Sequence, residues 1–191
     1  MITPVKVSLA LWVGWLAFWF IAARSTATTV ARQSVAARLT HLVFLWAGAA
    51  LLFGHPHQLV TWYQPIVPGD AWVRWGGVVL VILGIGFTVW ARVHLGRFWS
   101  ATVTLKAEHA LIRSGPYALS RHPIYTGLLL ALVGTAISRG TSADAAGLVL
   151  IVLGVLLKIR QEEALLLAHF GGAYRAYRQE VPMLIPRLWG T

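Results

Sequence analysis

The sequence contains no cysteine and only six acidic residues among 191. The absence of cysteine excludes disulfide bonds and thiol catalysis. Charged residues make up 12% of the chain, about half the share found in soluble domains. Since 58% of the residues are hydrophobic and the mean hydropathy is +0.69, the chain lacks the polar surface that a water-soluble domain needs. We therefore expect an integral membrane protein.

The sequence also lacks the motifs of several soluble enzyme classes. No glycine-rich phosphate loop follows a predicted strand, and no G-x-S-x-G nucleophile turn is present. The seven histidines show no metal-ligand spacing backed by a third ligand, so no metal site is predicted. The net charge of +10 does not indicate nucleic-acid binding, because the basic residues lie between apolar segments. We interpret them as topology signals and contacts to anionic lipids.

Five apolar segments predict an all-α integral membrane protein with about five transmembrane helices. The first has three tryptophans and no clear cleavage site, so it is interpreted as a retained helix and not as a signal peptide. The last two are shorter than the ~20 residues of a perpendicular span, which leaves partial insertion open for each. The chain length allows one membrane domain, residues 1–191. The segments are residues 7–23, 40–54, 72–93, 124–137 and 145–157.

The last two segments are expected to form a helical hairpin over residues 123–169, because only the short turn 138–143 separates them. Each has small residues on one face, which allow close helix approach in lipid. Asp144 is expected to be the N-cap of the second helix. The small residues are Gly127, Ala131 and Gly134 in one segment and Ala143, Gly147 and Gly154 around the other.

Two polar stretches interrupt the apolar pattern. The first, "HALIRSGPYALSRHPIYTG", covers residues 109–127, and the second, "KIRQEEALLLAHFGGAYRAYRQEVPMLIP", covers residues 158–186. Pro123 fits the first turn of a helix, so Arg121 and His122 lie at a positive helix start that suits an anionic or carbonyl ligand. Taken alone, Arg121 and His122 equally fit a cationic membrane anchor, and Glu162 equally fits a solvated i,i+4 pair with Lys158.

Together, the two stretches resemble the isoprenylcysteine carboxyl methyltransferase family, which overlaps the phospholipid methyltransferases. The resemblance covers residues 90–186, and residues 1–89 carry no family signature. The chain would thus comprise N-terminal transmembrane helices (1–89) and a methyltransferase-like core (90–191). The shared elements, in order, are R-H-P-x-Y-x-G at 121–127, a short helical hairpin, E-E at 162–163, F-G-x-x-Y-x-x-Y at 170–177 and V-P-x-x-x-P at 181–186.

The resemblance implies that S-adenosyl-L-methionine is bound in a cytoplasmic pocket formed by the hairpin and the C-terminal segment. It also implies catalytic roles for Arg121, His122 and Glu163. Arg121 would pair with a carboxylate of the cofactor or the acceptor, and His122 or Glu163 would act as base if the acceptor is a protonated amine or thiol. The choice between Glu162 and Glu163 as cofactor ligand stays open. The implied cofactor-binding residues are His109, Ala110, Leu111, Ile112, Tyr117, His122, Pro123, Ile124, Tyr125 and Glu162.

The methyl acceptor implied by the resemblance is lipophilic: an isoprenylcysteine-like carboxylate, or a lipid amine or thiol. Lys158 stands where the family has a substrate-side arginine, and a lysine lacks the bidentate fork that suits a carboxylate. We expect Lys158, Trp90 and Trp99 to contact the acceptor, which would enter from lipid between the third helix and the helix that starts at Pro123. No protein partner is inferred. A nicotinamide-dependent membrane reductase related to sterol reductases, or a non-enzymatic membrane protein, are the alternatives.

The loop charges predict the orientation in the inner membrane of a prokaryote. Thirteen of the sixteen Lys and Arg residues fall on one side of the five-helix arrangement, and the loop 55–71 contains none. The positive-inside rule then places the N-terminus outside and the C-terminus in the cytoplasm. A topology reporter fused after Thr191 should therefore report the cytoplasm, and one inserted near Gln64 should report the outside. Two reporters on the same side would show that one of the five segments does not cross.

Overall fold

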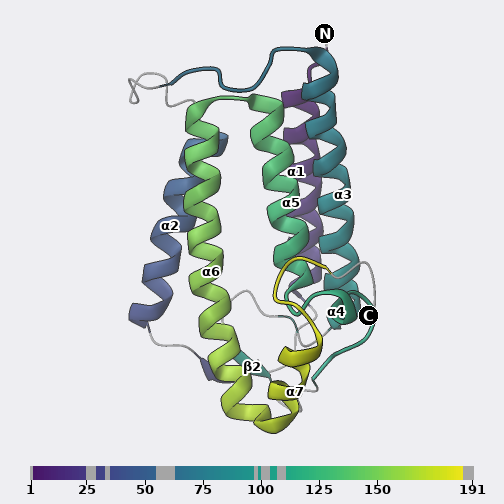
Figure 1. The fold of residues 1–191 in the computed structure, drawn as a ribbon, viewed down its shortest axis with the longest axis vertical. Helices are drawn as coiled ribbons and strands as arrows, with labels where there is room; N and C mark the ends of the chain where they lie inside the picture. Colours follow the sequence, from purple (N-terminus) through teal and green to yellow (C-terminus); the bar gives the residue numbers. More distant parts are fainter. Residues whose placement is uncertain are drawn as a thin grey trace.

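The computed structural model describes residues 2–24, 29–32, 35–54, 63–96, 99, 104–106 and 111–186. Five long helices run alternately up and down as a bundle, and two short helices lie at one end of it (Figure 1). The helices are α1 (Pro4–Ala22), α2 (Val35–Phe53), α3 (Ala71–Leu95), α4 (Pro116–Leu119), α5 (Pro123–Arg139), α6 (Ser142–Phe170) and α7 (Gly172–Glu180). The predicted helical fold is confirmed except for a short antiparallel ribbon of β1 (Thr29–Arg32) and β2 (Thr104–Lys106).

All five predicted apolar segments form helices. By length and composition, α1, α3 and α6 can each cross a membrane, whereas α5 and residues 38–53 of α2 are apolar but shorter. The chain is therefore an integral membrane protein, and the number of crossings stays a prediction. Helix α6 is much longer than its apolar segment, because it continues into the polar E-E stretch and ends at Phe170.

The small residues lie at the α3–α5 and α2–α6 contacts, whereas the sequence predicted an α5–α6 contact. Helices α5 and α6 follow each other through a tight turn, but α5 packs mainly on α3 and α6 packs mainly on α2. A Cβ atom on Gly127 of α5 would lie 2.6 Å from the Gly84 carbonyl oxygen of α3. A Cβ atom on Gly147 of α6 would lie 2.7 Å from the Gly48 carbonyl oxygen of α2. The close-packed α5–α6 hairpin predicted from the sequence is therefore wrong, since each small face meets another helix.

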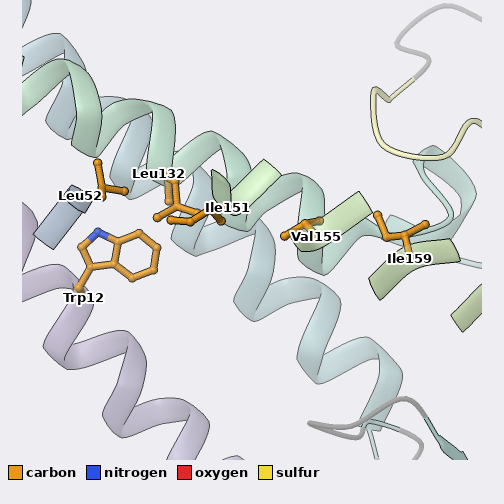
Figure 2. Close-up of a cluster of buried hydrophobic side chains, with 7 residues drawn as sticks. Trp12, Leu52, Leu132, Ile151, Val155 and Ile159 are labelled. Carbon is orange, nitrogen blue, oxygen red and sulfur yellow. The ribbon is translucent and has the colours of Figure 1, made fainter. Parts of the chain in front are cut away.

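An apolar core links the two helix pairs. Its buried side chains come from four helices and lie in a row along the bundle (Figure 2). Trp12 also donates from its indole Nε1 to Thr135 Oγ1 at 2.9 Å, so its polar atom is satisfied inside the bundle. The row consists of Trp12 from α1, Leu52 from α2, Leu132 from α5, and Ile151, Val155 and Ile159 from α6.

Three arginines donate to carbonyl groups at the C-terminal ends of neighbouring helices. The last carbonyls of a helix have no partner within that helix, and a guanidinium from another helix supplies one. From the sequence, these three arginines are interpreted only as charges in the loops between the apolar segments. The bonds run from Arg74 to the carbonyl of Ile137 (3.2 Å), from Arg92 to Ala22 (2.5 Å) and from Arg139 to Gly54 (2.6 Å). Arg92 also donates to Gly96, the C-cap of its own helix, at 2.8 Å.

The start of α6 differs in detail from the prediction. The N-cap is Thr141, and Asp144 is the third residue of the helix, so the assignment of Asp144 as N-cap was wrong. The two residues form a reciprocal capping box, in which each side chain bonds the backbone N–H of the other. Asp144 is fully buried and also accepts from Arg139 Nε at 2.7 Å.

The α3–α5 contact gives a testable difference between two glycines of α3. A Cβ atom on Gly84 would lie 2.5 Å from backbone atoms of α5, whereas one on Gly86 would meet nothing within 4 Å. Gly84→Leu should therefore destabilise the protein by about 1–3 kcal/mol through overpacking. Gly86→Leu, the matched control, should leave the thermal midpoint in detergent close to that of the unsubstituted protein. Equal midpoints for both variants would contradict the α3–α5 contact.

Candidate functional site

The R-H-P and E-E motifs of the two polar stretches meet at the end of the bundle where α5 begins and α6 ends (Figure 1). Two prolines start helices here, Pro116 in α4 and Pro123 in α5, where the missing N–H costs nothing. Gly115, with φ +58°, makes the turn into α4. The R-H-P motif is thus held in the short connection between α4 and α5.

The three residues predicted to be catalytic form one charged cluster. Arg121 Nε donates to Glu163 Oε1 at 2.9 Å, and His122 Nε2 lies 3.2 Å from the same oxygen. Arg178 Nε lies 3.5 Å from the other carboxylate oxygen of Glu163. The exposed fractions of the Arg121 and Glu163 side chains are 9% and 11%, so these charges are largely removed from solvent. A charge buried to this degree requires such partners.

Glu162 belongs to a second group of contacts next to this cluster. Its Oε1 accepts from the Tyr125 hydroxyl at 2.5 Å, and its Oε2 lies 3.7 Å from His122 Nδ1. His122 therefore lies between the two glutamates. Lys158 Nζ lies 5.5 Å from the centre of the Tyr125 ring, close enough for a cation–π contact. The Glu162 side chain, 23% exposed, is the more accessible of the two carboxylates.

Residues 181–186, which we call the C-terminal strap, lie across the R-H-P motif. Three consecutive backbone carbonyls of the strap, those of residues 182–184, accept hydrogen bonds from residues in and beside the motif. Met183 and Leu184 also pack against the apolar core. The hydrogen bonds run from Arg121 N to Pro182 O (2.8 Å), from His122 N to Met183 O (3.2 Å), from Ser120 Oγ to Met183 O (3.0 Å) and from Thr126 Oγ1 to Leu184 O (2.6 Å).

Helix α7 carries two buried tyrosines, one of which bonds α4. Tyr174 and Tyr177 are 1% and 2% exposed, and the Tyr177 hydroxyl donates to the Tyr117 carbonyl at 2.6 Å. Burial raises the pKa of Tyr177 to about 12, and it raises the pKa of Tyr117 and of Tyr174 as well. These hydroxyls therefore stay protonated at neutral pH. Tyr174 and Tyr177 pack with Val181 in a buried apolar cluster.

Ser120 and Thr126 are site residues that the sequence analysis missed. Besides bonding the strap, their hydroxyls lie 3.0 Å apart, and Ser120 Oγ accepts from the backbone N–H of His122 at 3.2 Å. Ser120 directly precedes the R-H-P motif and Thr126 lies three residues after it, so their position was the available signal. His94, also missed, lies 2.9 Å from Ser114 Oγ through its Nε2 atom, beside the turn into α4.

Several predicted site residues lie apart from the charged cluster. Leu111 packs with the α7 tyrosines. Trp90 is 48% exposed, and Trp99 stacks on Trp19 of α1 with ring centres 5.1 Å apart. The structure therefore does not bring Trp90 or Trp99 to Lys158. Ile112, Pro123 and Ile124 lie in the described part of the chain, whereas His109 and Ala110 lie outside the described residues.

Along the glycine contact, α3 and α5 leave no opening to lipid, and the predicted opening at the level of Trp90 stays a prediction. The helix backbones touch at Gly84 against Gly127 and at Gly77 against Gly134. An open apolar groove lies instead between α1 and α3, with walls that include Trp15, Phe18, Ile85 and Val89. Trp15 closes one side of it, held by a 2.7 Å hydrogen bond from its Nε1 to Thr88 Oγ1.

Comparisons with known proteins confirm the resemblance found in the sequence. Residues 77–168 match the model of the isoprenylcysteine carboxyl methyltransferase (ICMT) family. The chain is 31% identical over 142 residues to the cobalt-zinc-cadmium resistance protein CzcN of Cupriavidus metallidurans. It is 30% identical over 118 residues to protein-S-isoprenylcysteine O-methyltransferase B of Arabidopsis thaliana. The family match begins within α3, earlier than the sequence motifs indicated.

These alignments cover 73% and 60% of this chain and 58% and 60% of the relatives, so the chain spans about three fifths of their length. The fold is similar to a solved structure of the eukaryotic intramembrane Ras methyltransferase ICMT, with a TM-score of 0.56 and 22% identity. That superposition covers 77% of this chain and 52% of the other. The structural likeness thus extends the resemblance to most of the bundle.

Proposed function

With residues 77–168 matching the ICMT family as the premise, we propose that this chain is an integral membrane methyltransferase that uses S-adenosylmethionine. The acceptor we propose is lipophilic and is methylated at the cytoplasmic face of the membrane. The observation that carries the proposal is the convergence of the R-H-P and E-E motifs on His122, at the end of an apolar bundle. A purely structural membrane protein would leave this costly group of buried charges without a purpose.

The residues present fit S-adenosylmethionine, which is an adenosine carrying a zwitterionic amino-acid tail. Glu162 is the accessible carboxylate and can accept from an ammonium or a hydroxyl group. The rings of His122 and Tyr125, with centres 5.9 Å apart, offer flat walls beside it. When bound, this cofactor supplies a methyl group made electrophilic by the sulfonium charge. The chain's own residues would then bind and orient the two reactants, a contribution that can reach about 7–11 kcal/mol.

The acceptor's head group decides whether a base is needed. A carboxylate needs none, and the ammonium of Lys158 beside Tyr125 would favour its approach. A protonated amine or a thiol needs one. Glu163 is already paired with Arg121 and His122, so His122 Nδ1, on the side of the accessible Glu162, is the better placed candidate.

Cofactor binding tests the proposal most directly. The purified protein in detergent should bind S-adenosylhomocysteine and not NADPH, as measured by calorimetry. Glu162→Gln should weaken this binding by about 1–3 kcal/mol, because a charged acceptor is lost. Glu180→Gln is the matched control, since Glu180 lies at the same end of the molecule but is 60% exposed and paired with Arg113. Binding of NADPH alone would favour the reductase, and binding of neither would argue against both enzymes.

A homologous series of acceptors tests the lipophilic substrate. With labelled S-adenosylmethionine, the rate for alkyl carboxylates, amines and thiols should rise with chain length. Each buried methylene contributes about 0.8 kcal/mol, or about a fourfold increase, until the apolar site is filled. The head group that reacts would identify the chemistry. A rate independent of chain length would instead indicate a small water-soluble acceptor.

A further inference from the structure

The guanidinium of Arg121 is already engaged by the protein itself. Its Nε atom donates to Glu163 of α6 at 2.9 Å. Its Nη1 atom donates to the carbonyl of Val181 at 2.6 Å and to that of Arg178 at 3.2 Å. Since the side chain is only 9% exposed, these contacts are made away from solvent. One side chain thus joins the start of α5, the polar end of α6 and the end of α7.

The two carbonyls belong to the last turn of α7 and to its C-cap, Val181. Carbonyls at this position have no helical partner, and Arg121 supplies donors to both. This is the arrangement seen for Arg74, Arg92 and Arg139 elsewhere in the bundle. Arg121 differs from these three arginines because it also bonds the carboxylate of Glu163, which contacts His122.

Loss of this side chain would affect His122 by two routes. The strap begins at Val181, and His122 donates its backbone N–H to Met183 within it. The imidazole Nε2 of His122 faces Glu163, whose position depends on Arg121 and, at 3.5 Å, on Arg178. Arg121 therefore supports both the backbone and the ring of His122 without needing to contact a ligand.

We propose that Arg121 is a positioning residue, which holds the C-terminal strap and Glu163 against His122 and does not bind the carboxylate of the cofactor or acceptor. This inference rests on the proposed function. It assigns Arg121 a role different from the carboxylate partner expected from the sequence. Its consequence is that Arg121 affects cofactor binding regardless of whether the ligand carries a carboxylate.

A pair of ligands separates the two roles of Arg121. S-adenosylhomocysteine and its decarboxylated analogue share the adenosine and the ammonium and differ in the carboxylate. Arg121→Ala should weaken both by the same factor, about tenfold. Arg175→Ala is the matched control, because Arg175 is an exposed arginine of α7 outside the charged cluster, and it should change neither affinity by more than about twofold. A loss confined to the carboxylate-bearing ligand would overturn the proposal.

The strap can be observed independently of any ligand. The chain has no cysteine, so Ile185→Cys, at a strap position that is 84% exposed, provides a single site for a spin label. In this background Arg121→Ala and Arg121→Lys should both increase label mobility, since the single nitrogen of a lysine cannot occupy the separate positions of Nε and Nη1. Arg175→Ala should not. Unchanged mobility in both Arg121 variants would overturn the proposal, whereas failure of the unsubstituted protein to bind S-adenosylhomocysteine would count against the proposed function alone.

Discussion

The fold depends on hydrogen-bond donors for the carbonyl groups at the C-terminal ends of its helices, which lie in an apolar bundle. An unpaired carbonyl in an apolar surrounding costs several kcal/mol, so each helix end needs a partner. Here guanidinium groups from neighbouring helices meet that need at the ends of α1, α2 and α5. Each bond also ties two helices together at a fixed height. The arginines therefore set the relative positions of the helices, in addition to any role in orienting the chain.

Between these ends, glycine contacts decide which helices are neighbours. The α3–α5 and α2–α6 pairs are close because backbone meets backbone, and the apolar row of Trp12, Leu132 and Ile151 joins them. At the polar end of the bundle, the start of α5 and the last turns of α6 are joined by side chains instead, through the contacts of Arg121 and His122 with Glu163.

The sequence predicted the positions of the helices and of the motifs, but it missed the contacts between residues that are far apart in the chain. Hydropathy located all five long helices, and the motif order brought Arg121, His122, Glu162 and Glu163 together correctly. The sequence did not reveal which helices pack through their small residues. Gly127 and Gly147 each lie on a face of small residues, and the sequence does not show which helix packs against that face. Arg74 and Arg139 looked like loop charges, since their acceptors lie 63 and 85 residues away. Trp99 stacks on Trp19, a contact that the sequence did not reveal, and the assignment of Trp90 and Trp99 to the acceptor stays a prediction.

The strap also fixes the order in which the site is assembled during synthesis. Its carbonyls bond residues that precede it by 58 to 63 positions, and the whole of α6 lies between. When α5 has been made, Ser120, Arg121 and Thr126 have none of these partners yet. The strap leaves the ribosome only after α5 and α6 have been made. The polar site is therefore completed after the apolar helices that carry it.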